Sequence, residues 1–138
     1  MEWMLLPYRR YAEFTGRSRR KEFWLFQLFQ WLVALVVMAV FGRTGYVSSG
    51  FFAAAVTDVS GVGGGLLALF RLVSLIPGLA LAVRRLHDQD RSGWLLLLIL
   101  IPLFGWFALL VLMCLDGTRG ANRFGSDPKD QNNADVFA

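Results

Sequence analysis

The feature that most constrains this chain is an apolar run without charge over residues 23–42. As a helix rising roughly 1.5 Å per residue, such a run covers the roughly 30 Å hydrocarbon core of a bilayer. Two further apolar runs follow at 66–83 and 94–115. With 56% hydrophobic and only 17% charged residues, a soluble chain of 138 residues could not bury its apolar surface in one core. The sequence predicts a small, polytopic all-α membrane protein with one membrane domain over 23–115.

The third run contains two helix-breaking residues near its centre, Pro102 and Gly105. One tilted or kinked span is the simpler interpretation, because a chain reversal exposed to lipid leaves backbone groups unpaired. The alternative is a re-entrant hairpin, and the sequence leaves it open.

Arg71 is the intramembrane polar residue of the second run, which also contains Pro77 and Gly78. We expect Pro77 to kink that helix. An arginine inside a membrane span is a functional candidate, although near a helix end its side chain can extend to the interface instead.

Three polar segments flank these runs. Residues 1–22 are basic and carry aromatic side chains at helical spacing, which indicates either an amphipathic interfacial helix or a basic tail. Residues 43–65 end in a glycine-rich stretch and are predicted to be a flexible outer loop. Residues 116–138 form a polar tail whose last ten residues we expect to be disordered.

The basic residues indicate an orientation. Six of the fourteen Lys and Arg residues precede the first run, and Arg84, Arg85 and Arg91 lie between the second and third. Basic clusters beside membrane spans face the cytoplasm, which predicts a multi-pass protein of the bacterial inner membrane with a cytoplasmic N-terminus. Clusters held so close to a bilayer disfavour a nucleic-acid partner. The tail lies outside if the third run crosses once, and inside if that run is re-entrant.

The polar stretch between the second and third runs also contains His87, Asp88 and Ser92. These residue types occur in nucleophilic catalysis, but one short loop rarely brings nucleophile and base into hydrogen-bonding reach. We expect Asp88 to pair with Arg84 or Arg85, at helical spacing. The sequence therefore predicts no catalytic residue and no enzyme.

Metal and cofactor sites are not predicted. One histidine and the single cysteine, Cys114, cannot form a zinc site or a disulfide. The aspartates of the tail lack the spacing of a calcium-binding loop.

Basic residues near inner helix ends can also bind phosphate headgroups, so an anionic phospholipid is the expected partner. The alternative is that these residues only set topology. The candidate headgroup-binding residues are Arg17, Arg19, Arg20, Arg84, Arg85 and Arg91.

Three motifs occur in order beside the apolar runs: GRSRRKEFW at 16–24, RRLHD with RSGW at 84–94, and a tail motif at 117–128 containing GT, NRFG and DP. In this arrangement the chain resembles the YhaH/YhaI-like bacterial inner-membrane proteins, the domain of unknown function 805 family. Arg119, Ser126 and Leu95 depart from the family pattern. The resemblance implies a membrane location and a fold, but no activity. Its polar motif residues are Glu22, His87, Asp88, Ser92, Asn122, Arg123 and Asp127.

The sequence thus favours a non-enzymatic membrane component that binds anionic lipid or a partner protein through its basic loops. An oligomeric transporter or efflux subunit, with Arg71 and the Pro77-Gly78 break on its path, is one alternative. An enzyme acting on lipid headgroups is another, and it would require His87 beside a cavity. The substrate, the partner and the oligomeric state are not determined by the sequence.

Overall fold

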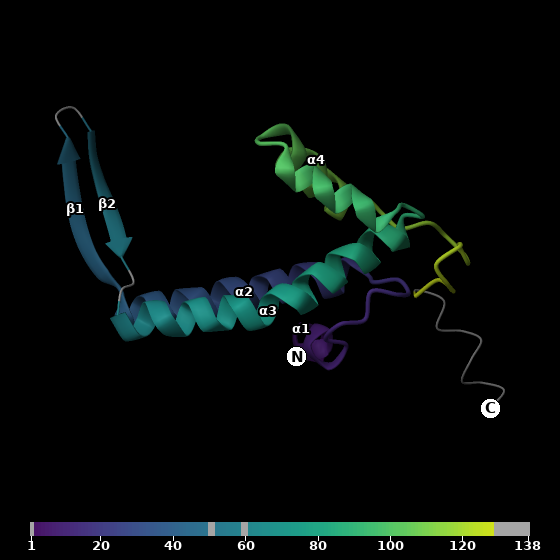
Figure 1. Ribbon diagram of the computed structural model, residues 1–138, viewed down its shortest axis with the longest axis horizontal. Helices are drawn as coiled ribbons and strands as arrows, with labels where there is room; N and C mark the ends of the chain where they lie inside the picture. The colour runs from purple at the N-terminus through teal and green to yellow at the C-terminus, as the bar shows by residue number, and fades with distance from the viewer. Residues whose placement is uncertain (1, 50–51, 59–60, 129–138) are drawn as a thin grey trace. The chain divides into compact units, whose positions relative to one another are not determined.

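The computed structural model describes residues 2–49, 52–58 and 61–128. The elements follow the order α1 (Glu2–Arg9), α2 (Arg20–Phe41), β1 (Arg43–Ser49), β2 (Phe52–Asp58), α3 (Gly61–Asp88), the 3-10 helix η1 (Gly93–Leu100) and α4 (Phe104–Cys114) (Figure 1). The chain forms two compact units, residues 1–26 with 76–138 and residues 27–75. The disorder predicted for the last ten residues concerns positions outside the described ones.

The predicted helical class is confirmed, but with fewer long helices than expected. Helices α2 and α3 are long and apolar enough to cross a membrane by length and composition. Both exceed their predicted bounds, since α2 begins at Arg20 and α3 continues through Pro77 to Asp88. A helix satisfies its own backbone hydrogen bonds, so it can extend beyond the strictly apolar run.

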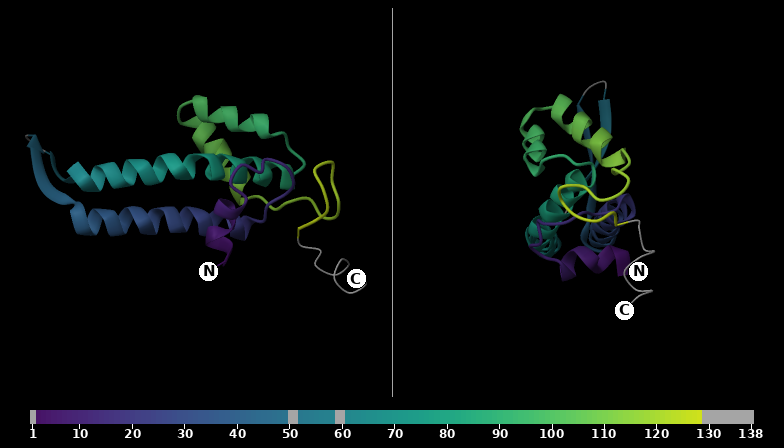
Figure 2. Two further views of the ribbon diagram at one scale, coloured as in Figure 1. Left: turned by 60° about the horizontal axis from the view of Figure 1, so that its bottom comes forward. Right: turned by 90° about the vertical axis from the view of Figure 1, so that its right-hand side faces the viewer.

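The third apolar run is a helical hairpin. η1 ends before Pro102, α4 begins at Phe104, and the two helices pack side by side (Figure 2). Proline disfavours helical backbone at the residue before it, and Ile101 is extended. Leu103 then takes a positive φ of 63°. Gly105 lies so close to the carbonyl of Leu98 that a Cβ would overlap it. The single kinked helix expected from the sequence is therefore not formed.

The unit of residues 27–75 contains the largest departure from the sequence prediction. The segment expected to be a flexible loop forms an antiparallel pair of strands, in register from Arg43 opposite Asp58 to Ser49 opposite Phe52. The glycines of 61–65 lie in the first turns of α3 instead of in a loop. β-branched and aromatic residues in 43–58 favour strands, but the Asn-Gly and Asp-Gly dipeptides that mark a hairpin most strongly do not occur in this segment.

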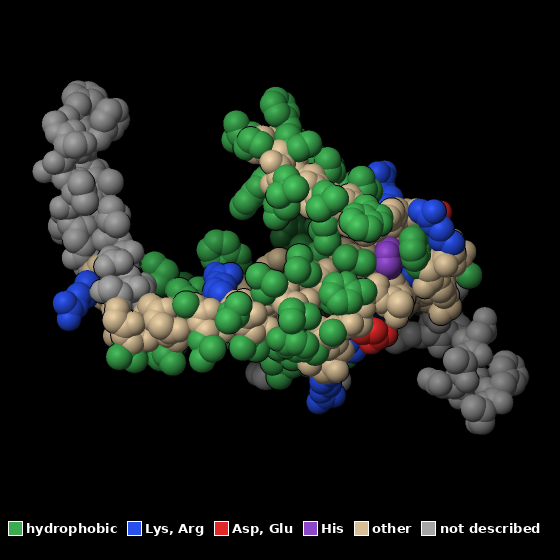
Figure 3. Space-filling view, viewed as in Figure 1, with side chains coloured by type: hydrophobic (Ala, Val, Ile, Leu, Met, Phe, Trp, Pro, Cys, Tyr) green, Lys and Arg blue, Asp and Glu red, His purple; other side chains and the backbone are tan. Residues whose placement is uncertain are grey.

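The core of the other unit lies where α2 begins, α3 ends and α4 ends. Its buried side chains are Phe23, Phe26, Leu81, Leu86, Leu109, Leu112 and Met113. Gly78 allows the Phe26 ring to approach α3, since a Cβ there would already be in van der Waals contact with Cε1 at 3.7 Å. Elsewhere most large apolar side chains are exposed, and hydrophobic side chains cover the visible face of α4 (Figure 3).

The N-terminal segment is helical only over α1. Tyr8 packs against Phe26, with ring centroids 5.4 Å apart. Beyond α1, the Arg10 guanidinium donates to both Glu13 carboxylate oxygens at 2.7 Å. This hydrogen bonding holds the pKa of Glu13 below its ordinary value. Helix α1 is shorter than an amphipathic helix over the whole of residues 1–22, one of the two interpretations of the sequence.

Candidate functional site

The site is centred on Asp88, the last residue of α3. Its two carboxylate oxygens accept from different arginines, Oδ1 from Arg17 Nε at 3.0 Å and Oδ2 from Arg85 at 2.6 Å. All three side chains are at least 97% buried. The sequence predicted a pair of Asp88 with Arg84 or Arg85, and the Arg85 partner is observed. The pair with Arg17 joins residues 71 positions apart.

Arg17 also binds the tail. Its terminal nitrogens donate to the carbonyls of Thr118 and Gly120, each at 2.6 Å. Asp127 lies 3.9 Å from the same guanidinium and accepts from the Gly120 backbone N–H. A planar guanidinium with five donors can hold several acceptors at fixed angles, which a lysine could not do. Arg17 thereby fixes the tail motif against the end of α3.

The tail motif in turn caps α3. The last carbonyls of a helix lack intrahelical partners. Here Thr118 donates its backbone N–H to the Asp88 carbonyl at 2.8 Å, and Asn122 Nδ2 donates to the His87 carbonyl at 2.9 Å. Arg123 bonds the Asp90 carbonyl at 2.7 Å and pairs with the Asp90 carboxylate. Capping of α3 is therefore a structural role of the tail motif.

The end of α4 is capped by side chains from the other two helices. Arg20 donates to the Cys114 carbonyl at 3.0 Å, Arg85 to that of Leu115 and Gln89 to that of Leu112. Cations at a helix carboxyl end also complement its dipole. The helical hairpin therefore returns to the same place at which α2 begins and α3 ends.

A second buried ion pair joins α2 and α3. The Arg84 guanidinium lies 3.6 Å from Glu22 Oε1, and both side chains are almost fully buried. Ser18 donates its hydroxyl hydrogen to the other Glu22 oxygen. Three nitrogens of the Arg84 guanidinium have no hydrogen-bond partner in the part of the chain that is described. Because both side chains are buried, removing one of them would leave an uncompensated buried charge. We call these two ion-pair groups, together with the tail contacts of Arg17, the motif cluster.

The arginines proposed for headgroup binding separate into two groups. Arg17, Arg84 and Arg85 are buried inside the motif cluster. Arg19 and Arg20 are half-buried, with Arg19 bonded to the Pro128 carbonyl and Arg20 paired with Asp116. Of the six, Arg91 is exposed. Arg71 lies in the other unit, exposed on α3.

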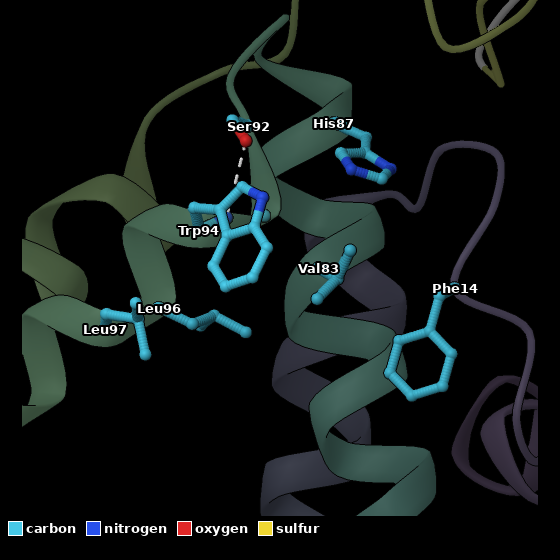
Figure 4. Close-up of a pocket in the computed structure, with 8 residues that line it drawn as sticks. Phe14, Val83, His87, Ser92, Trp94, Leu96 and Leu97 are labelled. Atoms are coloured by element: carbon cyan, nitrogen blue, oxygen red, sulfur yellow. Dashed lines mark hydrogen bonds between the residues drawn. The ribbon is translucent and has the colours of Figure 1, made fainter.

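His87 stacks on Phe124, with ring centroids 3.8 Å apart and planes 4° apart. It lines a pocket of about 370 Å³ together with Phe14, Val83, Ser92 and the first residues of η1 (Figure 4). Ser92 caps η1 by accepting from the Trp94 backbone N–H at 3.4 Å. In Figure 4 the Ser92 hydroxyl is directed at that backbone and not at the imidazole, so the two do not form a nucleophile and base pair.

Among the described residues, no group of three His, Cys, Asp or Glu side chains is placed to hold a metal ion. What the motif cluster can do chemically is join three chain segments by charge-assisted hydrogen bonds. Sequence reasoning missed Gln89, Thr118 and Asp116 as members of this arrangement. The sequence gave a signal only for Thr118, which lies in the tail motif. Gln89 and Asp116 gave none, because a single side chain that bonds a distant group has no recognisable sequence spacing.

A substitution at Gly117 tests how the tail packs against the motif cluster. A Cβ at this position would overlap the Asp88 carboxylate. We expect Gly117→Ala to displace the tail from α3 and to lower the melting temperature in detergent. Gly65→Ala is the matched control, because a Cβ there meets nothing within 4 Å and alanine favours a helix interior by about 0.5–1 kcal/mol over glycine. Equal melting temperatures for the two variants would contradict the observed docking of the tail.

Comparison with known proteins identifies the family of this chain. The profile of the family described as Protein of unknown function (DUF805) matches residues 11–126, which include the first two motifs and the tail motif as far as Ser126. The Inner membrane protein YhaI of Escherichia coli K12 is 39% identical over 96% of this chain and 100% of its own length. The Inner membrane protein YhaH of the same strain is 38% identical over 94% and 98%. The Uncharacterized protein YiiR is 29% identical over 85% and 86%. No solved structure matches the chain.

Proposed function

Because this chain belongs to the DUF805 family, with inner-membrane proteins among its relatives, we propose that it is a non-enzymatic membrane component that binds anionic phospholipid at the end holding the motif cluster. The observation that carries the proposal is the distribution of polarity. Apolar side chains are exposed along α2, α3, η1 and α4, while the charged motifs gather where these helices begin or end. Such a surface suits lipid along the helices and headgroups at their charged end.

The proposed topology has α2 and α3 crossing the membrane and the η1–α4 hairpin entering it from the cytoplasmic side. Its support is that Arg17, Asp88 and the tail meet in one cluster. Residues in direct contact lie on one side of a bilayer, so the N-terminal motif, the end of α3 and the tail share that side. The tip of the hairpin, at Leu103 and Phe104, is over 80% exposed and apolar, as lipid contact requires. The excess of basic residues near this shared side supports a cytoplasmic location for it.

The proposed headgroup site lies at the start of α2. Lys21 is exposed and lines a pocket with Arg20, Trp24, Leu25 and Cys114. Cations at the rim of apolar walls that include a tryptophan match a phosphate headgroup above an acyl chain. Arg17, Arg84 and Arg85 already bind protein groups, so we do not assign these three of the six predicted arginines to the headgroup site. Lys21 is included in the proposed site because its side chain is exposed.

Replacing Lys21 with alanine should lower the amount of phosphatidylglycerol that co-purifies with the protein. A basic residue near an anionic surface contributes about 1 kcal/mol, which corresponds to about fivefold in affinity at low salt. Bound lipid per protein is measured by mass spectrometry at low and high ionic strength. Arg43→Ala, at the start of β1, removes an exposed cation outside the site and should leave bound lipid unchanged. Equal lipid content in wild type and Lys21→Ala would refute the headgroup site.

A further inference from the structure

A second pocket lies between the end of α3 and the start of η1, with Phe14 of the N-terminal segment on its far side (Figure 4). Its volume of about 370 Å³ is that of a site for a small ligand or part of a larger one. All of its lining residues belong to the unit that contains the motif cluster. Neither the ion pairs nor the capping contacts of that cluster use this space.

The walls of the pocket are polar at one end and apolar elsewhere. His87 and Ser92 supply the polar groups, while the apolar lining is Phe14, Val83, Trp94, Leu96 and Leu97. In Figure 4 the Trp94 indole extends toward Val83. Gly93 fits closely against Val83, where an added Cβ would be 2.9 Å from Cγ1. This ordering of polar and apolar groups is that of an amphiphile site.

His87 forms part of the polar end, and its ring is half-buried. Its Nδ1 is inaccessible to solvent and lies beside the Gly16 backbone, so the polar contact that the ring offers to a ligand comes from the edge that lines the pocket. Stacking on Phe124 fixes the plane of the imidazole. A ring held in one orientation offers that edge at little conformational cost to a ligand.

A positive charge lies beside this end. Arg91 directly precedes Ser92, its side chain is exposed, and it joins none of the ion pairs observed among the described residues. Trp94 is 79% exposed, and tryptophan is characteristic of the headgroup level of a bilayer. Arg91 is therefore next in sequence to a pocket that has polar groups at one end and apolar walls elsewhere, a combination that suits the phosphate, glycerol and acyl chain of a phospholipid.

We propose that one anionic diacyl phospholipid occupies this pocket as a bound lipid. Its acyl chain contacts Phe14, Trp94 and Leu97. Its glycerol region lies at His87 and Ser92, and its phosphate lies toward Arg91. This inference rests on the proposed function, because it assumes the same membrane face, but it concerns a different site from that of Lys21. The bound lipid fills the space between α3 and the helical hairpin.

The test uses the full chain in phosphatidylcholine vesicles that contain phosphatidylglycerol with a photoreactive group on its acyl chain. After irradiation, labelled peptides are identified by mass spectrometry. We expect label concentrated on the peptide that contains Trp94 and Leu97. Leu97→Trp fills the pocket and should lower that label by about fivefold. Leu110→Trp is the matched control, because Leu110 lies on α4 outside the pocket and is 55% exposed against 54% for Leu97.

Two further variants keep the test decisive. Phe14→Ala removes one apolar wall from a loop position and should also lower the label, so the result does not depend on the folding of Leu97→Trp. Arg91→Ala should lower the label from phosphatidylglycerol but not that from a photoreactive phosphatidylcholine. Label spread evenly over the exposed helices, or equal labelling of Leu97→Trp and Leu110→Trp, would overturn the inference.

The Lys21→Ala variant separates this inference from the proposed function. It should lower total bound anionic lipid while leaving the label at Leu97 in place. If Lys21→Ala lowers bound lipid and the pocket variants change nothing, only the pocket assignment fails. If no variant changes bound anionic lipid or label, the proposed function fails as well.

Discussion

Replacing Asp88 with alanine should lower the free energy of unfolding by about 3–5 kcal/mol, the usual cost of removing one partner from a buried ion pair. The change leaves the guanidiniums of Arg17 and Arg85 buried without their shared carboxylate. Two like charges would then face each other in a site that excludes water. We expect the tail to detach from α3, because Arg17 holds it through the same cluster.

Asp90→Ala is the matched control. It removes the same side chain two residues away, where the pair with Arg123 is about half exposed. Exposed pairs contribute roughly 0–1 kcal/mol, so the loss should be small. Unfolding is followed by tryptophan fluorescence in detergent, with limited proteolysis to report on the tail. A loss for Asp88→Ala no larger than that for Asp90→Ala would mean that the cluster does not stabilise the fold.

The second large expected effect is the reactivity of single cysteines toward a reagent that does not cross the membrane, and it is all-or-none. Single cysteines placed at Thr15 and Ala121, in a chain whose Cys114 is replaced by alanine, should both resist a membrane-impermeant maleimide in intact cells. Both positions are exposed and lie beside the motif cluster, so they become reactive once the membrane is permeabilised. A cysteine at Ser49, in β1, should react in intact cells because α2 lies between it and the cluster.

One labelling result would contradict the motif cluster. If Ala121 reacted in intact cells while Thr15 did not, the third apolar run would cross the membrane. Arg17 could then not contact Thr118, and the motif cluster would not exist in the membrane. Matching protection of Thr15 and Ala121, with opposite behaviour at Ser49, is the result that the cluster requires.

Much of the fold could be predicted from composition and spacing. The first two apolar runs are long enough to determine α2 and α3, because the length of a helix in lipid is set by bilayer thickness. Their ends were underestimated, since charged residues such as Arg84 and Arg85 continue the helix when other elements cover them. The strand pair was not predicted, because residues 43–58 contain neither an Asn-Gly nor an Asp-Gly dipeptide and do not alternate strictly between apolar and polar side chains.

The candidate site was predicted only as a set of residues. The sequence singled out Arg17, Arg84, Arg85 and Asp88, and it predicted a pair of Asp88 with Arg84 or Arg85 from helical spacing. It gave the wrong environment for the arginines, because exposure depends on which segments cover a helix end. Nothing local reveals that Arg17 reaches a residue 71 positions away.

By itself, the sequence determined that this chain needs lipid, where its two long helices lie and which motifs carry its charge. These properties follow from local quantities, namely the length of apolar runs and the positions of charges. Only the tertiary structure decided that the third run turns back and that the motifs join in one buried cluster. Pro102 permits either a kinked helix or a reversal. The choice depends on packing at Gly105 and on the capping of α4 by Arg20, Arg85 and Gln89, which exist only when distant segments meet.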